Sequence, residues 1–148
     1  MPKKCSPLIS DQAIEFYSVQ FDNLNAGVTY TLESYRDLYR RTLHEMRGKF
    51  VEGELMLMID VCNGLMLTPG LAGQHIIADV SDGCDLDKLD QKLEIDKKTM
   101  IEKLESLPIF SLACLEVWAC GFWRSKNSKG EVGTYLGEDL KKWMEVLL

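Results

Sequence analysis

The stretch LPIFSLACLEVWACGFW, residues 107–123, restricts the possible folds of this chain more than any other feature. It is apolar on every side of a helix, and Glu116 is its one ionisable side chain apart from the thiols. Its 17 residues fall short of the roughly 20 that a helix needs to cross a bilayer. The stretch therefore predicts a helix enclosed by a protein core, with no membrane partner.

Apolar residues elsewhere recur at intervals of three and four, which is typical of amphipathic helices. Ser10 can cap a first helix that the NAG sequence at 25–27 would end, and a second helix is expected over about 32–47. Further helices are expected at 54–64, from Thr68 and Pro69 to about 81, at 85–93, 96–106, 109–123 and 136–147. Only VTYTL at 28–32 competes as a strand.

These elements predict an all-α fold, a single-domain orthogonal bundle of about seven to eight helices that spans residues 1–148. A chain of 148 residues with 46% hydrophobic and 27% charged residues can bury one sizeable core. The third and seventh predicted helices, the most apolar ones, should form its centre. The net charge of −6 repels nucleic acid on average, although a local basic patch can override that sign.

The cysteines and histidines give no pattern that indicates catalysis or metal binding. The five cysteines are scattered, with no CxxC pair, which is typical of reduced thiols in the cytoplasm. An EF-hand calcium loop that began at Asp79 would place Gly83 fifth, whereas that loop needs glycine sixth. We therefore expect no metal, no cofactor and no enzymatic activity, and a cysteine- or metal-dependent enzyme ranks as the third hypothesis.

A basic stripe on the second predicted helix is the clearest electrostatic signal. At about 100° per residue, its members fall on one face of the helix, opposite the apolar side. Residues 36–49 carry a net charge of +3 within a chain of −6. Arginine suits bidentate contacts with carboxylate or phosphate, so the stripe predicts a partner-binding surface. The alternative is a solvated face with local ion pairs such as Arg41 with Glu45. The basic stripe consists of Arg36, Arg40, His44 and Arg47.

The segment LDQKLEIDKKTMIEKLESL, residues 89–107, resembles a DNA-binding helix-turn-helix. Leu89 and Leu93 match the first helix and Ile95 the apolar position after the turn, while Asp96 caps the second helix. The match departs from the family at Asp90, where a small residue is usual, and at Glu94, where a glycine is usual. Its acidic residues balance or outnumber its lysines, so contact with DNA phosphates gains little. The resemblance implies a nucleic-acid-binding role for Lys97, Lys98 and Lys103.

Aromatic side chains gather near the end of the chain. Such rings form either a core shared by the last two helices or a partner groove, and a homodimer is an open alternative. The rings are those of Trp118, Phe122, Trp123 and Trp143.

Together these features predict a cytoplasmic, non-enzymatic helical protein-interaction module or regulator. Its expected partner is another protein, and its expected source is a bacterium or a mobile element. The alternative is a nucleic-acid-binding regulator that uses the degenerate helix-turn-helix-like segment at residues 86–107.

Overall fold

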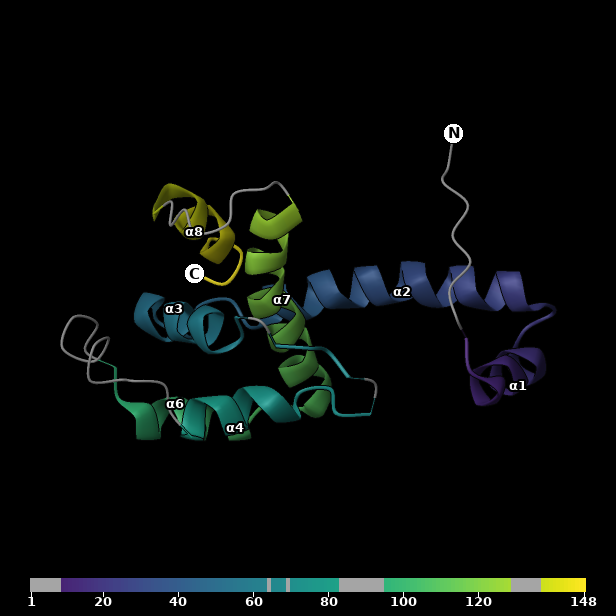
Figure 1. Ribbon diagram of the computed structural model, residues 1–148, viewed down its shortest axis with the longest axis horizontal. Coiled ribbons are helices and arrows are strands. Elements are labelled where there is room, and N and C mark those ends of the chain that lie inside the picture. Colours follow the sequence, from purple (N-terminus) through teal and green to yellow (C-terminus); the bar gives the residue numbers. More distant parts are fainter. Residues whose placement is uncertain (1–8, 64, 69, 83–94, 129–136) are drawn as a thin grey trace. The chain divides into compact units, whose positions relative to one another are not determined.

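The structure is a computed structural model that describes residues 9–63, 65–68, 70–82, 95–128 and 137–148. These residues form seven helices and no strand, which confirms the all-α prediction (Figure 1). The orthogonal packing and the total number of helices stay predictions, and the helix expected at 85–93 lies outside the described residues. The helices are α1 (Asp11–Gln20), α2 (Leu24–Glu45), α3 (Glu52–Val61), α4 (Gln74–Asp82), α6 (Lys97–Glu105), α7 (Ile109–Ser128) and α8 (Gly137–Met144).

The chain divides into two compact units, Met1–Arg40 and Arg41–Leu148, and the division falls within α2. The prediction of a single domain over residues 1–148 stays a prediction. Of the described helices, none combines the length and the apolar character that a bilayer crossing requires.

The first unit contains α1 and the greater part of α2, joined by a short turn. The side chain of Ser10 accepts a hydrogen bond from the N–H of Ala13, as predicted for the first helix cap. No residue of α1 is buried, so this unit is held by contacts between partly exposed rings. The ring centroids of Phe21 and Tyr30 lie 5.6 Å apart, and those of Tyr17 and Phe21 lie 5.9 Å apart.

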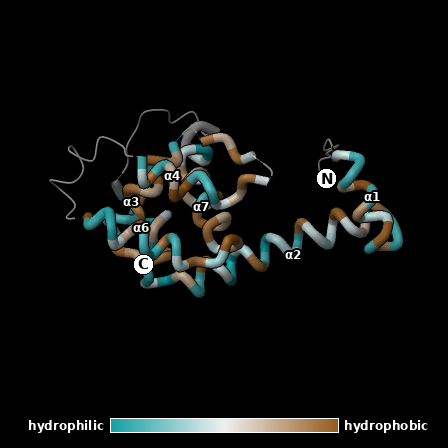
Figure 2. Tube along the Cα trace, turned by 90° about the horizontal axis from the view of Figure 1, so that it is seen from below, coloured by the Kyte–Doolittle hydropathy of each residue, from teal (hydrophilic) through white to brown (hydrophobic). Residues whose placement is uncertain are grey.

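The expected break at residues 25–27 and the possible strand at 28–32 are wrong, because α2 already begins at Leu24. Asn23 caps it, since its side-chain oxygen accepts the N–H of Ala26 at 2.8 Å. Gly27 does not end a helix but allows close packing. A Cβ there would lie 2.8 Å from ring atoms of both Tyr17 and Phe21. Apolar and polar stretches alternate along α2 (Figure 2).

The second unit has its core around α3 and α7, the pair that the sequence predicted. α7 packs against both α3 and α4, and α4 packs against α6 (Figure 1). Every described helix of this unit contributes fully buried side chains. Such packing covers a helix that has apolar residues on all sides. They include Leu55, Leu57, Met58, Ile76, Met100, Leu104, Leu115 and Met144, and Leu147, which follows α8, is enclosed as well.

The tryptophans of the second unit tie the last helices into this core. The Trp143 indole N–H donates to the Trp118 carbonyl oxygen at 3.0 Å, and the Trp118 indole donates to the Trp143 carbonyl oxygen at 3.3 Å. The Trp123 indole donates to the Ile59 carbonyl oxygen on α3 at 2.9 Å. Because Trp118 and Phe122 are buried, this cluster contributes to the core of the unit.

The predicted start of the fourth helix at Thr68 and Pro69 is wrong, because α4 begins at Gln74. Thr68 donates its hydroxyl to the Met66 carbonyl oxygen instead of capping the helix. The amide groups at the beginning of α4 are satisfied by Glu116, a buried residue in the middle of α7. The cap therefore comes from a distant part of the chain, where local rules do not apply.

Candidate functional site

Arg36 and Arg40 of the basic stripe lie in the first unit, in the middle of α2, and both are exposed. The Nε atom of Arg36 lies 3.2 Å from Oδ1 of its neighbour Asp37. Both of these side chains are more than half exposed, so water and salt weaken the pair and leave the arginine accessible to other anions. Arg40 forms no ion pair with a described residue.

His44 and Arg47 lie in the second unit, where buried neighbours fix the backbone that carries them. His44 belongs to the last turn of α2, and Arg47 follows in the turn that Gly48 completes. The N–H of Gly48 donates to the Leu147 carbonyl oxygen at 2.8 Å, which ties this turn to the C-terminal end of the chain. Four side chains of the same segment point into the core, namely Thr42, Leu43, Met46 and Phe50.

The cations of this segment face solvent between those buried residues. Arg41, His44, Arg47 and Lys49 are all exposed. Among the residues that the structure describes, no acid lies within ion-pair distance of Arg41, Arg47 or Lys49, so the local pair of Arg41 with Glu45 is not formed. Positive charge on a fixed backbone, without an acidic neighbour, can bind an external carboxylate or phosphate with little ordering cost.

Two lysines of the helix-turn-helix-like segment, Lys97 and Lys103, contact other helices, whereas Lys98 pairs within α6. Helix α6 forms as predicted, because the Asp96 carboxylate accepts the N–H groups of Lys98 and Thr99. Lys97 donates to the Ser81 carbonyl oxygen at 2.6 Å, and Lys98 lies 3.9 Å from Glu102. The helix proposed to precede α6 in the motif lies outside the described residues, so the helix-turn-helix stays a prediction.

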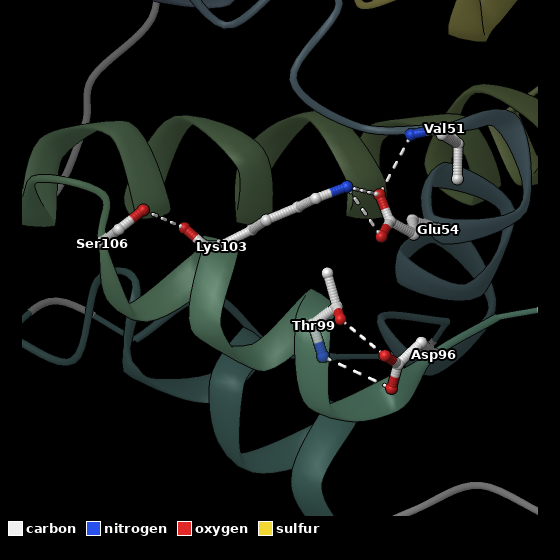
Figure 3. Close-up of polar contacts among 6 residues, drawn as sticks. All are labelled: Val51, Glu54, Asp96, Thr99, Lys103 and Ser106. Carbon is white, nitrogen blue, oxygen red and sulfur yellow. Dashed lines mark hydrogen bonds and ion pairs between the residues drawn. The ribbon is translucent and has the colours of Figure 1, made fainter.

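Lys103 holds α6 against the start of α3 (Figure 3). Its ammonium group lies 2.8 and 2.9 Å from the two oxygens of Glu54, whose side chain is 5% exposed. The same carboxylate accepts the N–H of Val51 at 3.0 Å, and the ammonium lies 5.9 Å from the centre of the Phe50 ring. Glu54 therefore has both a charge partner and a hydrogen-bond donor, as a buried carboxylate requires. Lys103 serves packing here.

Glu116 forms the other buried charged site of the second unit. Its Oε2 accepts the N–H of Gly73 at 2.6 Å, and its Oε1 accepts those of His75 and Ile76 at 3.0 and 3.2 Å. The positive end of the α4 dipole also favours a carboxylate at this point. Gly73 permits the approach, because its φ is +79° and a Cβ would lie 2.8 Å from Cβ of Leu112.

The sequence did not reveal the partners of Glu54 and Glu116, although it contained one signal. A single acid within a helix that is otherwise apolar must find donors when that helix is buried. The segment 107–123 shows this pattern at Glu116. The donors to Glu116 could not be named, because they lie 40 to 43 positions away.

The described thiols are reduced and buried: Cys62, Cys114 and Cys120. Burial raises the pKa of Cys114 to about 11, although a hydrogen bond with Thr42 acts to lower this pKa. Within the described ranges, no group of three or more histidine, cysteine, aspartate or glutamate residues is placed to hold a metal ion. Cys62 and Cys120 are close neighbours, which the sequence did not indicate.

Comparison of the chain with protein-family models, with curated proteins and with solved structures found no match.

Proposed function

We propose that this chain is a non-enzymatic, cytoplasmic binding protein that binds an acidic surface of another protein through the basic stripe. One observation carries the proposal: all four members of the basic stripe are exposed, and among the described residues only Arg36 has an acid within ion-pair distance, the exposed Asp37. Exposed positive charges attract a partner of opposite charge over a distance and fix its orientation.

Charge segregation supports a partner of negative sign. The stripe and its flanks concentrate positive charge in a protein that is negative elsewhere. An acidic partner would therefore be repelled by most of the surface and attracted at the stripe, which gives specificity as well as association rate.

A protein partner is favoured over a nucleic acid by the state of the other lysines. Lys97 and Lys103 are engaged with Ser81 and Glu54, so α6 offers DNA few free cations. A duplex presents many phosphates over a wide surface, and binding it requires many cations to release counterions. The stripe alone is a narrow set of positive charges.

The test compares two double variants with the same change in charge. The stripe variant is Arg36→Glu with Arg40→Glu, and the control is Lys141→Glu with Lys142→Glu, two exposed residues of α8. Each protein is used to capture partners from native cell extract, with and without nuclease, and the captured proteins are identified by mass spectrometry.

We expect one protein to be captured by the wild type and by the control, to be lost with the stripe variant, and to persist after nuclease treatment. Loss of that protein with both variants would show that capture depends on non-specific charge interactions, and this would contradict the proposal. Capture that depends on intact nucleic acid would favour the nucleic-acid-binding alternative.

A further inference from the structure

A pair of free thiols lies where the C-terminal end of α3 packs against α7, inside the second unit. Cys62 is the residue that caps α3, and Cys120 lies in the middle of α7, 58 positions later. The thiol of Cys120 donates a hydrogen bond to the Cys62 carbonyl oxygen, which lies 3.6 Å from the Cys120 sulfur. The Cys120 sulfur therefore lies beside Cys62, although nothing in their spacing along the chain suggests it.

The surroundings make the two thiols unequal. A hydrogen bond from the Cys62 side chain holds the pKa of Cys120 below its ordinary value, against the effect of burial, and the charge of Arg124 also lowers it. The same hydrogen bond, together with burial, raises the pKa of Cys62. Glu116 and Asp79 raise both values. The pair thus consists of a thiol that loses its proton more readily and a neighbour that holds its proton more tightly, the usual arrangement of an attacking and a resolving cysteine.

We propose that Cys62 and Cys120 form a redox-active dithiol that a peroxide oxidises to a disulfide, which links the end of α3 to α7. The Cys120 thiolate attacks one oxygen of hydrogen peroxide and the O–O bond breaks. A sulfenic acid forms, and the departing hydroxide takes a proton and leaves as water. The Cys62 sulfur then attacks the Cys120 sulfur, the S–S bond forms, and the S–O bond breaks. The second hydroxide takes the Cys62 proton, so two thiols and one peroxide give one disulfide and two waters.

Access to the pair comes from the end of α3. Both cysteines are buried, at 1% and 3% exposure, so the closed protein protects them. Cys62 nevertheless lies directly after the last residue of α3, and the next residue, Asn63, is exposed. The end of a helix opens at a lower free energy than the whole unit, so a small oxidant can reach the pair without global unfolding.

Cys114 provides the internal comparison. It lies on the same helix, is equally buried and has no described cysteine as a hydrogen-bond partner, while burial raises its pKa to about 11. It should stay reduced under conditions that oxidise the pair. The location of Cys62 and Cys120 is also independent of the basic stripe, so this inference does not rest on the proposed function.

The experiment uses a full-length variant with Cys5→Ser, Cys84→Ser and Cys114→Ser, which leaves only the pair. After treatment with one equivalent of hydrogen peroxide, we expect the intact mass to fall by two hydrogen atoms and both thiols to resist alkylation in denaturant. Peptide mapping should link the tryptic peptides 50–88 and 104–124. Adding Cys62→Ser should stop the process at a Cys120 sulfenic acid, which dimedone captures.

The wild-type chain keeps the test decisive if the variant does not fold. Its peroxide-treated form, mapped by tandem mass spectrometry, should carry the Cys62–Cys120 bond with Cys114 still free. Because a bond across 58 positions restricts the unfolded chain, the oxidised protein should melt roughly 10 °C higher than the reduced protein. Two free thiols after treatment, dimers linked through either cysteine, or oxidation of Cys114 before the pair would each overturn the proposal.

Discussion

Replacement of Glu116 by alanine should lower the free energy of unfolding by about 3 to 5 kcal/mol. The substitution removes the acceptor of three N–H groups, at 2.6, 3.0 and 3.2 Å, at the start of α4. Each hydrogen bond to a charged acceptor contributes about 1.5 to 3 kcal/mol. The loss is smaller than their sum because water can enter the space that the side chain leaves.

Two further variants separate this effect from a general effect of removing charge. Glu116→Gln keeps one oxygen acceptor but turns an amide donor toward the backbone N–H groups. Its free energy of unfolding should therefore lie between those of the wild type and Glu116→Ala. Glu102→Ala removes an exposed acid of α6 that lies 3.9 Å from Lys98. That control should change the free energy of unfolding by less than about 0.5 kcal/mol.

The assay is urea unfolding followed by circular dichroism, with hydrogen exchange at the amides of Gly73, His75 and Ile76. Exchange at these amides should accelerate in Glu116→Ala, since each loses its acceptor. A loss below about 1 kcal/mol in Glu116→Ala, with exchange unchanged, would show that the carboxylate does not hold the start of α4.

Three other substitutions test the core, a turn and a helix cap by the same unfolding assay. Leu115→Ala should cost about 2 to 5 kcal/mol because the side chain is fully buried. Its control, Ile109→Ala on the same helix, should cost less than about 0.5 kcal/mol because Ile109 is 76% exposed. Equal losses would show that the core is misplaced. Gly73→Ala should destabilise by at least about 1 kcal/mol, since its φ of +79° and the nearby Leu112 leave a Cβ no strain-free position; an unchanged midpoint would contradict this.

The third substitution, Asp96→Asn, tests a pH dependence. The hydrogen bond from the Thr99 side chain, and then that from the Thr99 amide, hold the pKa of Asp96 below its ordinary 3.8. The contribution of the Asp96 carboxylate to the free energy of unfolding is therefore present above pH 3.8. It is lost as the pH falls through the lower pKa of the folded state. The advantage of the wild type over Asp96→Asn should stay constant from neutral pH down to the ordinary value of 3.8 and shrink below it; an advantage that grows on acidification would refute the assignment.

The sequence predicted the parts of the fold that depend on nearby residues. Ser10 and Asp96 cap their helices as expected, because a cap needs only the three or four residues that follow it. The apolar segment 107–123 had to be central, and α7 is. The start of α4 was misplaced because its cap is the side chain of Glu116, which the fold brings there from 43 positions away. Propensity at Thr68 could not compete with that contact.

The same distinction applies to the candidate sites. Periodicity alone placed the basic stripe opposite an apolar face, and its four members are exposed. Periodicity could not show that Lys103 would contact Glu54, 49 positions away, or that Cys62 would meet Cys120. Whether a charge faces solvent or an acid depends on tertiary packing, which one helix face does not encode.

The most direct test of the central claim is the affinity of the captured protein for Arg36→Glu with Arg40→Glu, measured by titration calorimetry over a range of salt concentrations. We expect the dissociation constant to rise at least about tenfold relative to the wild type, with a weaker salt dependence. The Lys141→Glu, Lys142→Glu control should stay within about twofold of the wild type. All three proteins should keep the same melting temperature. Equal affinity for the two double variants would contradict the assignment of the basic stripe as the binding surface.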